Sequence, residues 1–263
     1  MSRQIDRRRA LAMFGAVGLG AVAAACGGDA KTDSATGTTT TSAGTGTTGT
    51  SGAAPAGTVT ADLFDAAGSC ALTPEQTEGP YYLDIDRVRS DIREDRQGTP
   101  LRLAIRVREN GSCQPIADAA VDIWHCDATG LYSGFESAST GGGGRPGGGG
   151  AGATDTTRYL RGTQITNAAG IVEFLTVYPG WYRGRTVHIH CKVHLNNTEA
   201  LTAQLYFDEQ LTSEVYAAEP YASDTGRDTF NADDGIFSAE TILTVSRDGD
   251  GYLGVINLDV KSA

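Results

Sequence analysis

The sequence predicts an all-β protein, an antiparallel β-sandwich with long loops that follows a disordered N-terminal linker. From about Ala61 onward, sequence patterns with the period of a helix are scarce. Short runs rich in Val, Ile, Leu and aromatic residues recur instead, bounded by Gly, Asn, Asp and Pro. Such runs must bury an apolar face, and two packed antiparallel sheets meet that requirement. The expected strands lie within residues 101–110, 119–128, 170–180, 186–196, 201–209 and 251–261.

Residues 1–26 resemble an export signal that ends at Cys26. Three consecutive arginines at 7–9 precede an uncharged apolar run over 10–25, which is too short for a membrane span. The arginines resemble a twin-arginine signal, and "AAAC" resembles a lipoprotein cleavage box in which Cys26 becomes lipidated. Ala23 departs from the Leu usual in that box, and the alternative is cleavage nearby without a lipid. We expect an exported protein, extracellular or at the cell surface, with a membrane tether through lipidated Cys26.

Residues 27–60 consist mainly of Gly, Ser, Thr and Ala, as in "TGTTTTSAGTGTTGTSG". They cannot bury enough apolar surface to offset their ordering entropy, so we expect a flexible tether before a folded domain at 61–263. Removal of residues 1–25 takes away four arginines and one aspartate, a formal +3, and changes the net charge from −11 to −14. A domain this acidic is a poor candidate for binding nucleic acid or anionic membranes.

Four cysteines follow the predicted lipidation site. An even number in an exported chain indicates two disulfides, for which three connectivities are possible. We favour Cys70 with Cys113 and Cys126 with Cys191, and the alternative for the second pair is two free buried thiols.

A Gly-rich stretch lies at residues 141–152, between the second and third expected strands. It lacks the spacing and the following helix of a phosphate-binding loop, so we interpret it as a mobile loop. Because it follows Tyr132, it is expected to border any site to which that residue contributes.

His188 and His190 are two of only four histidines, and the alternation of a strand places both on one face. That geometry suits metal binding. A zinc site would require a third His, Cys or carboxylate nearby, but His194 lies four residues beyond His190, about 13 Å along the strand, and is farther still from His188. The chain has no H-E-x-x-H or paired C-x-x-C motif, and it lacks the acidic residue of a two-His-one-carboxylate ferrous site at short spacing.

Two tyrosines accompany the histidine pair: Tyr182, six residues before His188, and Tyr132 in "DATGLYSGF". A phenol has a solution pKa of about 10, and a strongly Lewis-acidic ion is needed to ionise it near neutral pH. Two tyrosinates and a hydroxide would neutralise the charge of Fe(III), and two neutral imidazoles would complete the coordination. The combination of two Tyr and two His therefore indicates ferric iron.

Five motifs occur in an order that resembles one enzyme family. They are "TPEQTEGPYY", "RxDIRED", "AAVDIWHCDATGLYSGF", "YLRGTQITNAAGIVEFLTVYPGWYRGRTVHIH" and "LTAQLYF". From about Cys70 to Leu258 the chain resembles the intradiol ring-cleavage dioxygenases, relatives of protocatechuate 3,4-dioxygenase and catechol 1,2-dioxygenase, and particularly their exported single-chain members. The resemblance implies a transthyretin-like β-sandwich.

The resemblance also implies roles for individual residues. The ferric ligands fall on Tyr132, Tyr182, His188 and His190. Catalytic roles fall on Arg185, on Gln204 and again on Tyr182, which a bound catechol would displace and which would then act as a base. Expected substrate contacts are Tyr81, Tyr82 and Trp181, whereas Trp124 is expected in the core and His125 in a structural role.

The implied reaction opens a catechol-type ring between its two hydroxylated carbons with Fe(III) and O₂, giving a cis,cis-muconate-type diacid. Two alternatives remain. One is a non-catalytic, transthyretin-like binding module, and the other is a Zn or Cu protein that uses the same histidines. Neither the particular catechol nor the oligomeric state can be inferred from the sequence.

Overall fold

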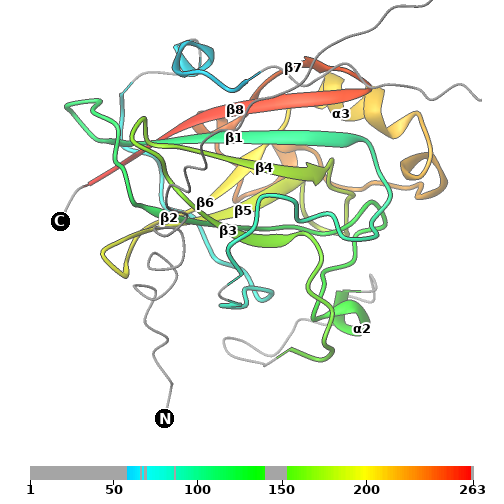
Figure 1. Cartoon of the computed structure of the whole chain (residues 1–263). Coiled ribbons are helices and arrows are strands. Elements are labelled where there is room, and N and C mark those ends of the chain that lie inside the picture. Colours follow the sequence, from blue (N-terminus) through cyan, green and yellow to red (C-terminus); the bar gives the residue numbers. More distant parts are fainter. Residues whose placement is uncertain (1–57, 66, 68–69, 86, 140–152, 262–263) are drawn as a thin grey trace, which may run out of the picture. The chain divides into compact units, whose positions relative to one another are not determined.

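Two β-sheets packed face to face form the domain (Figure 1). The computed structural model describes residues 58–65, 67, 70–85, 87–139 and 153–261. The predicted export signal, nearly all of the predicted linker and the Gly-rich stretch at 141–152 lie outside these residues. No helix in the described ranges is long and apolar enough to cross a membrane.

Each sheet contains four strands, and the order of the strands differs from their order in the chain. The first sheet has the order β4-β1-β8-β7, formed by β1 (Pro100–Glu109), β4 (Ile171–Val177), β7 (Thr244–Asp248) and β8 (Gly251–Val260). The second has the order β3-β2-β5-β6, formed by β3 (Arg161–Ile165), β2 (Ala120–Trp124), β5 (His188–Leu195) and β6 (Thr198–Tyr206).

The predicted all-β sandwich is confirmed, and a strand lies within each of the six predicted runs or overlaps it. Strands β3 and β7 were not predicted. Neighbouring strands run antiparallel apart from β1 and β8, which are parallel among the described pairs. These are the first and last strands of the domain. Because they are far apart in the chain, no hairpin joins them, and they are free to pair in parallel.

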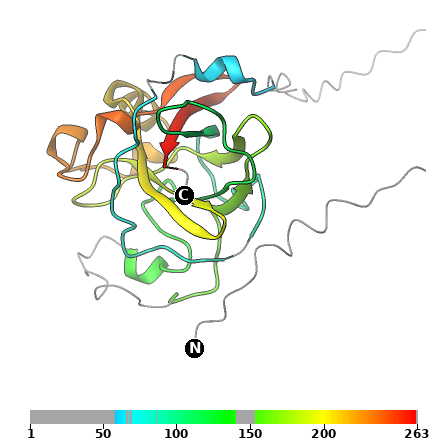
Figure 2. The ribbon, with the colours of Figure 1, turned by 90° about the vertical axis from the view of Figure 1, so that its left-hand side faces the viewer.

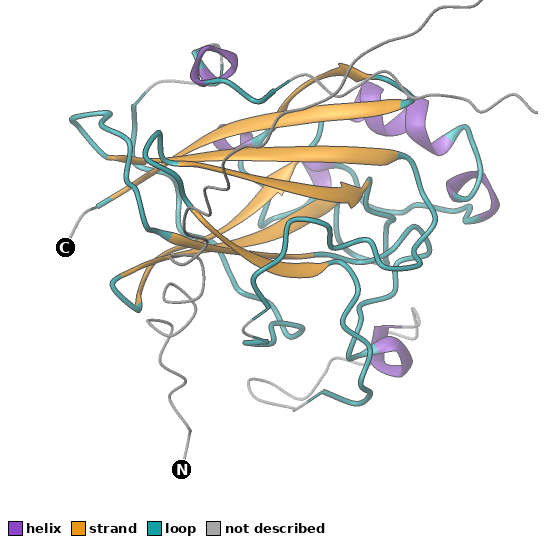
Figure 3. Ribbon diagram, in the orientation of Figure 1, coloured by secondary structure: helices purple, strands orange, loops and turns teal. Residues whose placement is uncertain are grey.

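Helices are short and lie outside the sheets (Figure 3). They are α2 (Glu136–Ser139), α3 (Glu209–Tyr216) and the 3₁₀ turns η1 (Ala61–Phe64), η2 (Tyr221–Ser223), η3 (Asn231–Asp233) and η4 (Ala239–Thr241). Helix α3 begins where the Asp208 carboxylate accepts hydrogen bonds from the N–H groups of Gln210 and Leu211. Two views at right angles show α2 and η1 on opposite sides of the domain (Figure 2).

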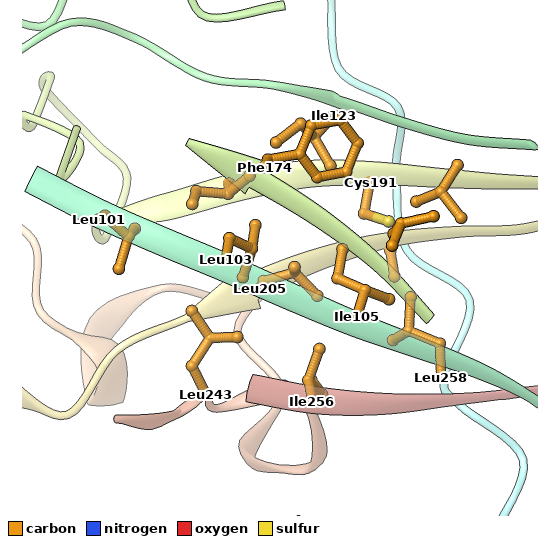
Figure 4. Close-up of a cluster of buried hydrophobic side chains, with 14 of the residues drawn as sticks. Leu101, Leu103, Ile105, Ile123, Phe174, Cys191, Leu205, Leu243, Ile256 and Leu258 are labelled. Atoms are coloured by element: carbon orange, nitrogen blue, oxygen red, sulfur yellow. The ribbon is translucent and has the colours of Figure 1, made fainter. Parts of the chain in front are cut away.

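The hydrophobic core lies between the two sheets, where apolar side chains from both meet (Figure 4). Leu103 of β1 is fully buried there, as are Ile189 and Cys191 of β5. Burial of each large apolar side chain stabilises the fold by about 1.5–3 kcal/mol. Because β5 alternates, His188 and His190 point to the opposite face of the second sheet, away from this core.

A segment before β1 links the open edges of the two sheets. The N–H of Arg89 donates to the carbonyl of Thr163 in β3, and the N–H of Ile92 donates to the carbonyl of Leu175 in β4, both at 3.0 Å. Ile92 is itself fully buried. The "RxDIRED" motif therefore closes one side of the sandwich and protects both edge strands from further pairing.

One of the two predicted disulfides is present. Cys70 and Cys113 are bonded, with their Cα atoms 5.6 Å apart. The predicted pairing of Cys126 with Cys191 is wrong, because both are free buried thiols. Cys191 pairs with Ile123 across the sheet and faces the core, whereas Cys126 lies three residues beyond Ile123 and packs among aromatic residues elsewhere.

Loss of the disulfide should lower stability measurably. It closes a loop with a sequence separation of 43 residues, so the double substitution of Cys70 and Cys113 by Ala should lower the free energy of unfolding by about 3–4 kcal/mol. Urea unfolding monitored by circular dichroism measures this change. The wild-type protein unfolded after reduction serves as the control and should match the double variant. Equal stability of the oxidised wild type and the variant would contradict the prediction.

Candidate metal centre

The candidate metal ligands lie on the face of the second sheet that is turned away from the core. His188 and His190 come from β5, and Tyr132 and Tyr182 come from loops that cover this face. These four residues are called the Tyr–His cluster below. A third covering segment, residues 74–83, also reaches it, since a Cβ added to Gly79 would lie 3.1 Å from His190 Cε1. The absent side chain at Gly79 therefore allows "TEGPYY" to approach the cluster.

The turn that carries Tyr132 is organised by Asp127. Its carboxylate accepts hydrogen bonds from the N–H groups of Thr129 and Leu131, at 2.9 and 3.1 Å, as in the Asx turns that Asp favours. Gly130 has φ +81, and a Cβ at this position would lie 2.4 Å from the Trp181 carbonyl oxygen. Glycine thus permits the loop of Tyr132 to pass directly against the loop of Tyr182.

The side chains of the Tyr–His cluster converge on one point. The Nε2 atoms of His188 and His190 are 3.1 Å apart, and the Tyr182 hydroxyl is 3.1 Å from His188 Nε2. The ring of Tyr132 meets those of Tyr182 and His190 edge-on, with centroid distances of 5.7 and 6.0 Å. The structure therefore brings together all four predicted ligands, two of which are fifty residues apart in sequence.

The cluster fits a single metal ion. Two donors that bind one ion at about 2.1 Å and at a right angle lie about 3 Å apart, close to the observed separation of 3.1 Å. His188 Nδ1 is 2.7 Å from the Thr186 carbonyl oxygen. A carbonyl only accepts, so Nδ1 carries the proton and Nε2 directs its lone pair into the cluster.

The tyrosines are essential to this fit. The buried hydroxyl of Tyr132 has no hydrogen-bond partner among the described residues, a costly arrangement that a metal ion would relieve. Across the same residues, no group of three or more His, Cys, Asp or Glu side chains is placed to hold a metal. A metal ion held at this point would therefore need the phenol oxygens as donors.

Burial sets the charge states of the cluster. It lowers the pKa of His188 to about 3 and that of His190 well below its usual value, so both imidazoles are neutral. Burial raises the pKa of Tyr132 and Tyr182, although the charge of Arg185 acts in the opposite direction on both. Without a cation both phenols stay protonated, and a strongly Lewis-acidic ion is required to ionise them.

The two further predicted catalytic residues lie together beside β5. Arg185 Nε donates to Asp234 Oδ2 at 2.9 Å, and Arg185 Nη2 donates to Gln204 Oε1. Gln204 is fully buried and pairs with His190 across the β5–β6 ladder. Its amide donates to the Thr77 carbonyl at 2.8 Å. The guanidinium is thus held by a carboxylate and an amide next to the ligand strand.

The three predicted substrate contacts lie in different places. Tyr81 stacks on the candidate ligand Tyr132, with ring centroids 4.6 Å apart. Tyr82 instead packs against Trp124 and donates to Asp122 Oδ2 at 3.2 Å. The indole of Trp181 donates to the carbonyl of Asp224 at 3.0 Å. Tyr81 therefore contacts the cluster directly, Tyr82 is linked to it through Trp124, and the hydrogen bond of Trp181 leads away from it.

Trp124 has a closer relation to the site than predicted. It pairs with His190 across β2 and β5, and the two rings are stacked 4.8 Å apart at an interplanar angle of 6°. The alternation of side chains along the two strands could have indicated this contact, because residues paired across neighbouring strands face the same side of a sheet. Asp234 and Arg161 were also missed, since nothing near them in sequence marks their contacts.

His125 has the structural role that was predicted for it. Its Nε2 is 2.7 Å from the Thr176 hydroxyl and its Nδ1 is 2.7 Å from the Cys126 carbonyl. The ring is fully buried, and burial lowers its pKa from 6.5 to about 4. His125 is thus a neutral hydrogen-bonding group that lies outside the Tyr–His cluster.

The low pKa of His125 predicts a loss of stability in acid. The unfolded chain binds the proton first, so the contribution is complete above pH 6.5 and is lost as pH falls toward 4. This group alone should lower the free energy of unfolding by about 3 kcal/mol between pH 7 and pH 4. Urea unfolding of metal-free wild type and His125→Gln at both pH values measures the difference. An identical pH dependence in the two proteins would contradict the prediction.

The fold and the cluster define a class of protein: a β-sandwich with two tyrosines and two histidines that converge on one buried point. A family model described as "Dioxygenase" matches residues 74–233. An intradiol ring-cleavage dioxygenase from Tetranychus urticae has 37% sequence identity and a TM-score of 0.69, over 73% of this chain and 95% of that chain.

Two further relatives agree. The dioxygenase domain of a dioxygenase and carbohydrate-binding protein fusion from Streptomyces sp. SirexAA-E has 27% identity and a TM-score of 0.54, over 73% of this chain and 99% of that chain. A chlorocatechol 1,2-dioxygenase from Pseudomonas putida is 26% identical over 153 residues, 50% of this chain and 52% of the relative. The chain thus spans about half the length of that relative. It belongs to the intradiol ring-cleavage dioxygenase family, as its motifs predicted.

Proposed function

We propose that the protein is an enzyme that uses mononuclear non-haem Fe(III) and O₂ to open catechol-type rings between the two hydroxylated carbons, giving cis,cis-muconate-type diacids. The observation that carries the proposal is the convergence of two phenols and two imidazole Nε2 atoms at one buried point. The names of the Tetranychus urticae and Pseudomonas putida relatives, which specify intradiol cleavage and a chlorocatechol, support the same chemistry.

In this proposal the Tyr–His cluster holds the iron. Fe(III) supplies the Lewis acidity that ionises phenols and activates a bound catechol toward O₂. The two neutral imidazoles add no charge, and two tyrosinates offset most of the charge of the ion. A Zn or Cu site that used the histidines alone would leave the Tyr132 hydroxyl buried and unpaired.

The two tyrosines differ in freedom of movement, and this difference separates their roles. Tyr132 is fully buried beneath Tyr81. Tyr182 is partly exposed and sits in a short turn, where Arg185 N–H donates to the Tyr182 carbonyl at 3.4 Å. Tyr182 is therefore the tyrosine that can leave its position and take a proton from a catechol hydroxyl.

Arg185 supplies a fixed positive charge beside the reacting ring. Asp234 and Gln204 orient its guanidinium, so little reorganisation is required when negative charge develops on the substrate carbon. Burial raises the pKa of Tyr182, and the nearby charge of Arg185 partly offsets this rise in the tyrosine that is expected to exchange with the substrate.

A visible absorption spectrum tests the proposal. Purified protein loaded with ferric iron should show a tyrosinate-to-iron charge-transfer band, and it should consume O₂ when a catechol is added. A colourless iron-loaded protein would contradict the assignment of the ligands. Zn-loaded protein is the matched control and should be colourless and inactive. A coloured protein that takes up no O₂ with any of several catechols would favour the non-catalytic binding module.

We also propose that the enzyme is exported and tethered through lipidated Cys26. The support is the basic and apolar pattern of residues 1–26 together with the small residues before Cys26. Cells labelled with a radioactive fatty acid should incorporate label into the wild type. Cys26→Ser should abolish labelling, whereas Cys126→Ser should retain it because that thiol is buried. An unlabelled wild type would contradict the proposal.

A further inference from the structure

Arg161, at the start of β3, is a buried cation that forms no ion pair with an acidic side chain among the described residues. The residue is 2% exposed. Its guanidinium donates from Nη1 to the Tyr81 carbonyl at 2.6 Å and from Nη2 to the Ser133 carbonyl at 2.7 Å. Nε donates to the Ser133 hydroxyl at 2.9 Å. Within the described part of the chain, none of its hydrogen bonds reaches a carboxylate.

Such a group is costly to retain. Burial lowers the pKa of Arg161 to about 10, so the guanidinium is still charged at neutral pH. A buried charge held by neutral carbonyl and hydroxyl groups and by an aromatic ring, here Phe135 at 5.7 Å from the guanidinium carbon, is stabilised less than one paired with a carboxylate. The cost of burying this charge therefore indicates that Arg161 has a role that a neutral side chain could not perform.

The acceptors of Arg161 lie on two sides of Tyr132. Ser133 follows Tyr132 in the chain, and Tyr81 stacks on the Tyr132 ring with centroids 4.6 Å apart. One guanidinium thus joins the loop that carries Tyr132 to the segment that covers it. The fixed fork of an arginine suits this task, because it directs several N–H groups at separate acceptors in one plane.

Arg161 also belongs to a row that crosses the sheet. It pairs with Trp124 between β3 and β2, and Trp124 pairs with His190 between β2 and β5. Trp124 in turn stacks on the His190 ring. A shift at Arg161 would therefore reach two members of the Tyr–His cluster, Tyr132 through the loop and His190 through the sheet.

We propose that Arg161 is a positioning residue that holds Tyr132 in place for the metal and adds a buried positive charge next to the loop that carries this tyrosine. Arg161 touches neither the substrate nor the metal position, and it acts through Tyr81 and Ser133. The inference rests on the proposed ferric site, because a tyrosinate ligand is what gives the buried charge a partner.

Iron release from the full-length protein tests this role. Ferric-loaded wild type, Arg161→Lys and Arg161→Met are mixed with excess chelator, and decay of the visible band is followed. Loss of a group that orients a ligand typically costs about 10–100-fold in metal affinity, so Arg161→Met should release iron faster by that factor. Arg161→Lys should lie between it and the wild type, since it keeps the charge but loses the fork.

Arg108→Lys is the matched control. Arg108 is also buried, at 8% exposure, but it is paired with Asp259 in the other sheet. This variant should release iron at the wild-type rate whatever its thermal stability. The band maximum should shift in both Arg161 variants and stay in place in Arg108→Lys, a difference that a general loss of stability would not produce.

The outcomes separate this inference from the proposed function. A wild type that binds ferric iron without a charge-transfer band would overturn both. A coloured wild type with Arg161→Lys and Arg108→Lys releasing iron at equal rates would overturn the role of Arg161 alone. If Arg161→Met does not fold, Arg161→Lys decides the question through the same comparison. Hydrogen exchange in the metal-free proteins should be faster at 131–135 in Arg161→Lys than in Arg108→Lys, and equal rates would count against the inference.

Discussion

Replacing Tyr132 with phenylalanine is expected to weaken and shift the visible band, because only Tyr182 could still supply a tyrosinate. It should also lower kcat/KM for catechols at least about a thousandfold, because a metal contributes several kcal/mol to transition-state stabilisation. The metal-free variant should be as stable as the wild type, or about 1 kcal/mol more stable, since the lost hydroxyl is buried without a hydrogen-bond partner. Few substitutions of a buried residue combine a severe loss of activity with unchanged stability. Spectra, O₂ uptake and urea unfolding of the same preparation measure all three quantities.

Tyr159→Phe provides the matched control for this experiment. Tyr159 is also buried, but its ring packs against the Arg96 guanidinium, 4.3 Å from the ring centroid. It should keep both the colour and the activity. A Tyr132→Phe protein that retains the wild-type band would show that the phenol at this position is not a ligand.

Replacing Arg185 with methionine should separate catalysis from iron binding. Removing one oriented group that stabilises developing charge typically lowers kcat roughly a hundredfold to a thousandfold. Arg185→Met should show this loss and keep the charge-transfer band, because Arg185 is not a ligand. Stability should fall by about 3 kcal/mol, since the buried carboxylate of Asp234 loses its ion pair. Steady-state O₂ uptake and the visible spectrum distinguish these effects.

Arg183, two residues earlier, is the natural control. Its side chain is 73% exposed and only loosely paired with Asp228, at 3.9 Å, so Arg183→Met should be close to the wild type in activity and stability. Equal losses in the two variants would mean that general charge, and not the oriented guanidinium of Arg185, supports catalysis.

Local pattern was enough to predict six of the eight described strands and the direction in which the histidine pair points. The runs that form β1, β5 and β8 have the length of strands and are rich in apolar residues, a combination that indicates buried strands. The parity of His188 and His190 was confirmed because Ile189 and Cys191 fill the core. The ferric assignment required more than pattern, since it relied on two tyrosines in family contexts fifty residues apart.

Contacts between distant segments were beyond local reasoning. Asp234 meets Arg185 across 49 residues, and Arg161 meets Tyr81 across 80. Neither position lies in a sequence pattern that identifies its partner. The prediction of a disulfide between Cys126 and Cys191 failed for a related reason, because a count of cysteines says nothing about the direction in which each side chain points. Tyr82 illustrates the same limit, since it shares a motif with Tyr81 and yet packs on Trp124.

Alternate side chains of strand β5 point in opposite directions. One set packs in the hydrophobic core, and the other contributes His188 and His190 to the Tyr–His cluster. The residues that stabilise the domain and the residues that hold the proposed metal can therefore change independently. The side of the cluster on which the proposed substrate would bind is formed by segments that cross the sheet without belonging to it. Replacement of those segments would alter which rings are accepted while the filled interior stays intact. A scaffold with this division of labour can acquire new substrates without first losing its fold.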